Sequence, residues 1–370
     1  MTSCFASTPE TPEAPAKTPT VFEHEEKVLS FSGIFTRNLL LLTLSKGLEL
    51  NKDLFVYDVS IEIDGKSHNI HTYRCGDGNT EDLVLFHGYG GSSALYYAML
   101  SDLSKHFRVF CIDFIGMALS THEQFDLKNN EETIRFMVDS VEKWRIAIGL
   151  ETFHLAGHSF GGYIACHYTV THQEKVKRLS LLSPLGMTKY ENDGPTWDDV
   201  KKRVGFWKSI GFKVMLTLFG GIFKSQKTLH QMVRDNPKFA RYMVRNYVNK
   251  RFGMKNKEAA EALRCYLLAM LSMPEGTEKI IFNVIKPPYG GCHSPLEEIV
   301  EEKLHIPVDC YFGEKDYMDT VGGKRIAANG KKKNYSLKIV PKAAHQVTMQ
   351  NPKFLSDELI KTVTIVNVEI

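Results

Sequence analysis

Short apolar runs alternate with helical stretches along most of the chain after residue 55. A run of four to eight apolar residues is typical of a buried strand, whereas apolar positions that recur every three or four residues are typical of a helix. The runs predict strands over residues 55–63, 68–74, 82–88, 107–114, 152–157, 176–184, 308–313 and 336–340, the first two as an antiparallel pair. The stretches that lie between these apolar runs predict helices over residues 93–105 and 131–148, from residue 160 onwards, near 321–329 and over 351–363. This alternation implies a mostly parallel sheet that is covered by helices on both faces.

The alternation is interrupted between residues 186 and 304, where the pattern is mainly helical with several Gly and Pro breaks. Because the interruption lies between two predicted strands, we expect it to be an insertion rather than an appended domain. Such an insertion would lie over the carboxyl ends of the strands, where open α/β sheets bind ligands. The predicted divisions are a core in two parts, residues 28–185 and 305–370, and a helical cap at residues 186–304.

Residues 1–27 are rich in Thr, Pro, Ala and Glu and poor in large apolar side chains, which predicts a disordered tail. The first arginine is Arg37 and several glutamates precede it, so a mitochondrial presequence is not supported. The N-terminus also lacks the charged and apolar regions of a signal peptide, and no apolar run reaches the ~18–20 residues needed to span a bilayer.

Composition places the chain among soluble globular proteins, with 43% hydrophobic and 24% charged residues. Its seven cysteines are scattered and include no C-x-x-C pair, so they predict neither a disulfide framework nor a zinc site. No cluster of His, Cys or carboxylate residues has the spacing of metal ligands. We therefore predict no metal and no cofactor.

A candidate nucleophile lies in the stretch Gly157-His158-Ser159-Phe160-Gly161, which matches the G-x-S-x-G pattern between a predicted strand and a predicted helix. In such an elbow the turn is so sharp that glycines are needed at Gly157 and Gly161, and the serine hydroxyl is exposed above the sheet. The alternative is a glycine-rich turn with an incidental serine. The strand before and the helix after favour Ser159 as a nucleophile.

Donors for an oxyanion are predicted from a second glycine-rich loop, His87-Gly88-Tyr89-Gly90-Gly91, which follows the strand "LVLF". One donor would be the backbone N–H of Tyr89 and the other that of Phe160, directly after the serine. The alternative is a tight loop held by Gly88 and Gly90 without a catalytic role. A phosphate-binding loop is disfavoured because neither G-x-G-x-x-G nor G-x-x-x-x-G-K-[ST] is completed.

A serine hydroxyl needs a histidine to take its proton, and the histidine needs a carboxylate to orient it. Among the 14 histidines, His345 lies in the loop after the last predicted strand. The carboxylate should follow the preceding strand, where Asp316 is the favoured candidate and Asp319 the reserve. The chain order serine, aspartate, histidine is the order that this architecture requires.

With these motifs in place, the sequence resembles the α/β-hydrolase superfamily over nearly everything after residue 55. More narrowly it resembles the branch that contains N-acylphosphatidylethanolamine lipases, lysophosphatidic acid acyltransferase-like proteins and cardiolipin deacylases. The resemblance is carried by "LVLFHGYGGSSALYY", "CIDFIGMALS", "HLAGHSFGGY", "LLSPLGM", "SPLEEI", "IPVDCYFGEKDYMD" and "HQVTMQNP". It implies an α/β-hydrolase fold with a cap and a lipid-ester substrate.

Three features of the sequence are compared with that branch. Ala118 stands where the branch has a glycine in the rim turn, for which we expect a small local change. The branch's H-x-x-x-x-D motif, associated with acyltransferase activity, reads His345 to Gln350 here. Loss of that carboxylate favours hydrolysis over acyl transfer. Some members of the branch have lost the nucleophile, whereas this chain has Ser159, which favours an active enzyme.

The cap contains an unusually basic stretch. Residues 201–257 contain 15 Lys and Arg residues and a single acid, Asp235, so this stretch has a net charge of +14. The whole chain has a net charge of +3, so the remaining residues together carry −11. Within it, "FWKSIGFKVMLTLFGGIFK" predicts a segment that lies on an anionic membrane surface. The predicted lipid contacts are Trp207, Lys208, Phe212, Lys213, Phe219 and Phe223. The alternative is a lid helix that simply covers the core.

No nucleic-acid recognition motif accompanies the basic cluster, so nucleic acid is not expected as a partner.

The leading hypothesis is a serine acyl hydrolase acting on glycerophospholipids, with anionic ones such as cardiolipin or lysophosphatidic acid among its substrates. We expect a cytoplasmic protein bound peripherally to a lipid droplet or organelle surface, with a mitochondrial location as the alternative. A lysophospholipid acyltransferase, a prolyl aminopeptidase-type peptidase and a non-catalytic lipid-surface adaptor are the alternatives. The acid-poor stretch 201–257 disfavours the peptidase, and the intact triad disfavours the adaptor. The sequence predicts no particular protein partner.

Overall fold

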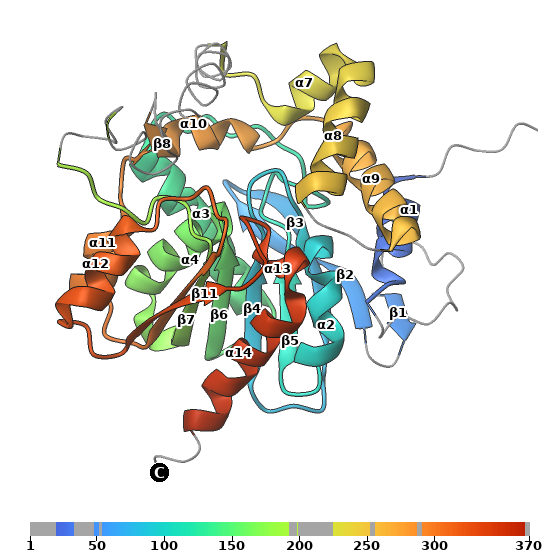
Figure 1. The fold of residues 1–370 in the computed structure, drawn as a ribbon. Helices are drawn as coiled ribbons and strands as arrows, with labels where there is room; N and C mark the ends of the chain where they lie inside the picture. Colours follow the sequence, from blue (N-terminus) through green and yellow to red (C-terminus); the bar gives the residue numbers. More distant parts are fainter. Residues whose placement is uncertain are drawn as a thin grey trace, which may run out of the picture.

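The computed structural model describes residues 20–32, 48–51, 54–191, 198, 225–251, 256–286 and 291–366. Its centre is a sheet of nine strands in the order β1-β2-β3-β5-β4-β6-β7-β10-β11 (Figure 1). The strands are β1 (Leu48–Asn51), β2 (Leu54–Ile63), β3 (Lys66–Cys75), β4 (Asp82–Phe86), β5 (Arg108–Ile112), β6 (Phe153–His158), β7 (Val176–Leu182), β10 (Val308–Gly313) and β11 (Tyr335–Val340). The pairs β1–β2, β2–β3 and β3–β5 are antiparallel, and the five remaining pairs, from β5–β4 to β10–β11, are parallel. The predicted mostly parallel sheet is therefore confirmed.

Helices cover both faces of this sheet. One face packs against α3 (Asn130–Ala147), α4 (Phe160–Thr171) and α12 (Val321–Asn329). The other packs against α2 (Tyr97–Leu103), which continues a 3₁₀ turn at Ser93–Tyr96, and α14 (Pro352–Val366), which follows the short α13 (Val347–Gln350). These elements lie where the sequence pattern predicted them.

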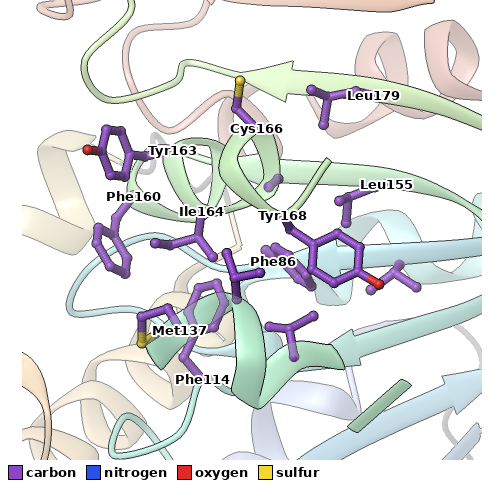
Figure 2. Close-up of a cluster of buried hydrophobic side chains, with 14 of the residues drawn as sticks. Phe86, Phe114, Met137, Leu155, Phe160, Tyr163, Ile164, Cys166, Tyr168 and Leu179 are labelled. Atoms are coloured by element: carbon purple, nitrogen blue, oxygen red, sulfur yellow. The ribbon is translucent and has the colours of Figure 1, made fainter. Parts of the chain in front are cut away.

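The parallel strands are the part of the chain most completely removed from water. Every residue of β4, β6 and β10 is buried, as expected for strands with helices on both faces. Figure 2 shows the core between α4 and the sheet, where Phe160 and Ile164 of α4 lie among Phe86, Phe114 and Met137. The first residue of α4 is thus a core side chain, which fixes the position at which β6 gives way to the helix.

The described part of the insertion is mainly helical. It contains α7 (Leu229–Asp235), α8 (Pro237–Arg251), α9 (Lys257–Leu271), α10 (Ile281–Val284), α11 (Leu296–Glu298) and a π-helical turn over Ile299–Lys303. A two-stranded antiparallel ribbon, β8 (Ile285–Lys286) with β9 (Gly291–Cys292), was not predicted, because strands of two residues leave no alternating pattern to detect. Figure 1 shows α7, α8 and α9 stacked together beyond one edge of the sheet.

The predicted tail boundary at residue 27 is wrong for its last residues, because they form α1 (Val21–Leu29). Thr20 accepts a hydrogen bond from the N–H of Glu23, and the Glu23 carboxylate accepts one from the N–H of Thr20, which together make a capping box. Val28 and Leu29 are buried, and the helix lies beside cap helix α9 (Figure 1). Composition alone did not reveal this helix, because its few apolar residues follow a long polar stretch.

A buried carboxylate attaches α1 to the sheet. Glu25 is only 4% exposed; it accepts a hydrogen bond from the Tyr73 hydroxyl, and Nε2 of His71 lies 3.3 Å from it. Nδ1 of His71 is 2.8 Å from Oδ1 of Asp58. Burial alone would lower the pKa of His71, but the charge of Glu25 and the hydrogen bonds to Asp58 and Glu25 outweigh it, so the pKa lies well above its ordinary value. His71 is therefore protonated between two carboxylates.

We predict that Glu25→Ala lowers the free energy of unfolding by about 3 kcal/mol, because it leaves the buried phenol of Tyr73 without its acceptor and the buried imidazolium of His71 with Asp58 alone. The histidine's contribution in the native protein is fully present below the ordinary pKa of about 6.5 and is lost as the pH rises through the raised folded value. Urea denaturation between pH 6 and 9 measures both effects. Lys27→Ala, on the exposed side of α1, is the control and should change little. Equal losses in the two variants would contradict the role given to Glu25.

Candidate active site

Ser159 lies between the last residue of β6 and the first residue of α4, in a backbone conformation that non-glycine residues rarely adopt. Its φ is +55° and its ψ is −116°. A Cβ on Gly157 would lie 2.3 Å from the carbonyl oxygen of Gly161, and one on Gly161 would lie 2.4 Å from the carbonyl oxygens of Phe86 and His87. Both glycines are therefore required by close backbone contacts, as the elbow pattern predicts.

His345 lies next to this serine although the two are far apart in sequence. It follows β11, and its Nε2 is 3.0 Å from Oγ of Ser159. Its other ring nitrogen, Nδ1, lies 3.3 Å from Oδ1 of Asp316, which is an ion-pair distance without the alignment of a good hydrogen bond. Ser159 and His345 are 8% and 4% exposed. The structure thus brings the three predicted side chains together in a relay of serine, histidine and aspartate.

The surroundings of Asp316 keep its carboxylate ionised. Burial alone would raise its pKa, but the neighbouring His345 and the hydrogen bonds from the Ser183 hydroxyl and the N–H of Met318 outweigh burial and lower the pKa. The reserve candidate, Asp319, accepts hydrogen bonds from the Tyr190 hydroxyl and from the N–H of Val321 at the start of α12. Asp316, rather than Asp319, is the acid that faces His345.

His158 forms a hydrogen bond with the backbone of His345. Its Nε2–H donates to the carbonyl oxygen of His345 over 2.8 Å, and the two rings lie 4.8 Å apart between centroids. Burial, together with the neighbouring His345, lowers the pKa of His158 to about 3. The ring therefore stays neutral and holds the backbone of the loop that carries His345.

The two predicted oxyanion donors belong to segments that are close to Ser159. Phe160 is the first residue of α4, where a backbone N–H has no acceptor within the helix. Gly88, just before Tyr89, is so close that an added Cβ would lie 3.2 Å from Cβ of Ser159. Gly90 has φ +67° and is covered by Leu229 of the cap. The segments that carry the predicted donors Tyr89 and Phe160 therefore both lie next to the serine.

Asp113, which sequence analysis did not single out, fixes this glycine-rich loop to the rim of the site. One oxygen of its buried carboxylate accepts from the N–H of Ser93 over 2.7 Å, and the other accepts from the N–H of Leu119 over 3.0 Å. In the same rim turn Ala118 has φ +51°, a left-handed conformation that an alanine adopts only with strain. A glycine at this position, as in the related branch, would relieve the strain.

The residue that replaces the branch's acyltransferase-associated carboxylate has a structural partner. Oε1 of Gln350 accepts a hydrogen bond from the N–H of Ala344 over 2.6 Å, directly before His345. Gln346, the residue directly after His345, donates a hydrogen bond from Nε2 to the hydroxyl of Tyr247 in α8. Gln350 therefore holds the His345 loop from within the core, and Gln346 connects it to the cap.

Sequence analysis also did not single out two buried acids of the cap, Glu275 and Glu278, because they lie outside the acid-poor stretch 201–257. Glu278 pairs with His230 at 2.9 Å, and Glu275 accepts from Gln231 over 2.8 Å. Burial, with added effects of these two carboxylates, raises the pKa of the nearby Tyr89 hydroxyl. Both acids therefore lie near the loop that carries the predicted oxyanion donor.

Several predictions fall where the structure gives little or no test. Trp207, Lys208, Phe212, Lys213, Phe219 and Phe223 lie outside the described residues. Within the described ranges, no group of three or more His, Cys, Asp or Glu residues is arranged to hold a metal ion. None of the described helices is long and apolar enough to cross a membrane.

Comparison with known proteins places this chain in a family. The family model of the alpha/beta hydrolase fold matches residues 83–352. A 1-acylglycerol-3-phosphate O-acyltransferase of Arabidopsis thaliana is 29% identical over 280 residues, which cover 73% of this chain and 63% of the relative. The 1-acylglycerol-3-phosphate O-acyltransferase ABHD5 of Sus scrofa is 33% identical over 267 residues, covering 70% and 69%. The chain thus spans less than two thirds of the plant protein.

Solved structures agree with this fold. Naproxen esterase of Bacillus subtilis superposes with a TM-score of 0.60 at 15% identity, covering 95% of this chain and 100% of that one. A bacterial membrane phospholipase A superposes with a TM-score of 0.58 at 17% identity, covering 84% and 87%. At these identities the likeness extends to the fold alone. The resemblance predicted from the motifs is confirmed, and the relatives fit the lysophosphatidic acid acyltransferase-like branch.

We predict that Gly161→Ala destabilises the protein by about 3 kcal/mol or more, because the new methyl group would collide with two rigid backbone carbonyl groups. Gly78→Ala is the matched control, since a Cβ there meets nothing within 4 Å. Chemical denaturation of both variants gives the difference. A loss at Gly161 no larger than at Gly78 would contradict the tight approach of α4 to the loop after β4.

Proposed function

The chain belongs to the α/β-hydrolase family, and from this premise we propose that it is a serine acyl hydrolase that cleaves fatty-acyl esters of glycerophospholipids. The observation that carries the proposal is the buried relay of Ser159, His345 and Asp316, with Nε2 of the histidine 3.0 Å from the serine hydroxyl. A hydroxyl, a base and an orienting carboxylate in this arrangement are the parts that acyl transfer to a serine requires.

In the first half of the reaction, Oγ of Ser159 attacks the ester carbonyl carbon while Nε2 of His345 accepts the hydroxyl proton. The resulting oxyanion receives hydrogen bonds from the N–H groups of Tyr89 and Phe160. The carbon–oxygen bond to the glycerol then breaks, and His345 returns the proton to the departing alcohol. The products are a deacylated phospholipid and an acyl ester on Ser159.

In the second half, His345 removes a proton from water, and the hydroxide oxygen attacks the acyl-serine carbonyl. The same two N–H groups bind the second oxyanion. Collapse releases the fatty acid and returns the proton to Ser159. Asp316 remains a carboxylate throughout, because the hydrogen bonds that lower its pKa persist, and it stabilises the imidazolium that forms twice in the cycle.

The lipid part of the proposal is supported by two observations. The relatives are named for acyl transfer to 1-acylglycerol-3-phosphate, an anionic lysophospholipid. The stretch 201–257 carries a net charge of +14, which suits anionic headgroups. We therefore propose that the protein works at the surface of a membrane or lipid droplet, peripherally bound from the cytoplasm, with residues 186–304 as its cap.

Acyl transfer to lysophosphatidic acid is the second candidate, and the names of the relatives favour it. In that reaction the acyl-serine would be attacked by a lipid hydroxyl instead of water. The residue at position 350 argues for water, because Gln350 is uncharged and its amide oxygen is occupied by the N–H of Ala344. The peptidase and adaptor alternatives have less support, since the relatives are named for lipid substrates and the relay is complete.

Replacing the nucleophile is the first test. We expect Ser159→Ala to abolish both labelling by a fluorophosphonate probe and fatty-acid release from anionic phospholipid vesicles, with a fall in kcat on the order of 10⁶-fold. Ser101→Ala, on α2, is the control and should label and hydrolyse as the native protein does. Equal release by Ser159→Ala would assign the activity to another group, and native protein that neither labels nor hydrolyses would favour the adaptor.

The choice between water and a lipid acceptor is tested by product analysis. Native protein incubated with a labelled phospholipid and excess lysophosphatidic acid should give free fatty acid as its main labelled product. Mass spectrometry separates this acid from newly formed phosphatidic acid. Phosphatidic acid as the main product, lost in Ser159→Ala, would replace hydrolysis by acyl transfer on the same nucleophile.

A further inference from the structure

Cap helix α8 carries an exposed apolar stripe. Ala240, Val244 and Val248 are buried, and these residues recur every four positions. Beside that buried face, large side chains of α8 are open to solvent: Phe239 (45% exposed), Tyr242 (63%), Met243 (48%) and Tyr247 (42%). Of the ten large apolar side chains exposed in the described residues, five belong to α7 and α8. Such a concentration on one surface marks an interaction site rather than the scatter found on ordinary surfaces.

The charges around the stripe identify the chemistry of its partner. Lys238, Arg241 and Arg245 are exposed on the same helix, and residues 237–251 include no Asp or Glu. Large aromatic and thioether side chains combined with cations are typical of helices that lie in the interface of an anionic bilayer. Lipid headgroups that carry negative charge attract such cations, and this attraction decays within a Debye length.

One end of the stripe lies next to the loop that carries the predicted base, His345. Tyr247, at its inner end, accepts a hydrogen bond from Gln346, the neighbour of His345 in the chain. Tyr317, which is 49% exposed, packs its ring 4.5 Å from that of His345 on the core side. Exposed aromatic surface of the cap and of the core therefore meets at the loop that holds the predicted base.

We propose that the exposed face of α8, formed by Phe239, Tyr242, Met243 and Tyr247, docks on an anionic phospholipid surface and delivers lipid from it to Ser159. The apolar side chains enter the acyl-chain boundary, and the arginines and lysine of the helix remain among the headgroups. A lipid that leaves the bilayer along this face passes Tyr247 before it reaches His345, so its acyl chains need not cross water. Both steps rest on the proposed function: docking rests on its proposed place at a membrane surface, and delivery rests on its proposed hydrolysis of phospholipids.

The test removes the stripe without touching the catalytic machinery. The triple variant Phe239→Ser, Tyr242→Ser, Met243→Ser changes only exposed side chains and leaves Tyr247 in place. A matched control, Ile146→Ser, Val321→Ser, Ile339→Ser, removes three comparably exposed apolar side chains elsewhere on the surface. Circular dichroism and thermal melting establish that both variants are folded.

Flotation with vesicles of phosphatidylcholine and phosphatidylserine measures docking. We expect the α8 triple variant to bind at least about tenfold more weakly than native protein, and the control to bind as native protein does. Native binding should weaken with added salt and with vesicles of phosphatidylcholine alone. Undiminished binding of the α8 variant would overturn the proposal. If the native protein is a dimer and the α8 variant is a monomer that still binds vesicles as the native protein does, the stripe faces a second copy of the chain, and the proposal is again overturned.

Two substrates distinguish delivery from catalysis. On vesicle phospholipid the α8 variant should lose activity in proportion to binding, while on a soluble short-chain p-nitrophenyl ester it should match native protein. Equal loss on both substrates in the folded variant would overturn the delivery step. Native protein that binds vesicles but hydrolyses neither substrate would contradict the proposed function and leave the docking step supported.

Discussion

The backbone at Ser159 has almost no freedom, and the rest of the site depends on that restriction. A positive φ at a serine is unfavourable by itself, and it persists only where the surroundings determine it. Here Gly157 and Gly161 touch backbone atoms on both sides of the turn, and Phe160 is anchored in the core immediately afterwards. The packing energy of α4 therefore stabilises an otherwise costly turn, and the same turn presents a hydroxyl and a helix N–H group to one side of the sheet.

The parts that meet this hydroxyl come from loops at the carboxyl ends of different strands, and each loop has its own support. The loop after β4 is held by Asp113 and by the hydrogen bond between Tyr266 of α9 and Ser92, 2.8 Å long. The loop after β11 is held by His158 and Gln350. The sheet thus provides the common edge, while buried polar contacts set the distances. One of these contacts, between Tyr266 and Ser92, involves cap helix α9, so the position of the cap and the geometry of the site are connected.

Much of this arrangement follows from sequence patterns because the patterns reflect local physics. Buried parallel strands give continuous apolar runs, and the elbow needs glycines at fixed positions around the serine. The contacts that complete the site are different in kind. Ser183 reaches Asp316, and Gln350 reaches Ala344, only after the chain has folded, so spacing along the chain gives no signal for either. The choice between Asp316 and Asp319 is similar, since they are three positions apart and only the direction of the loop decides which one faces the histidine.

Helix α1 has a practical consequence for anyone who wishes to produce a shortened protein. Composition suggests cutting the chain near residue 28, but that cut would remove Glu25 and most of the helix. His71 and Tyr73 would then remain buried without their acceptor, and the side of α9 that α1 covers would be left open to water. A shortened protein should therefore begin before Thr20, so that the helix keeps its cap and the hydrolase core keeps the carboxylate on which a buried charge depends.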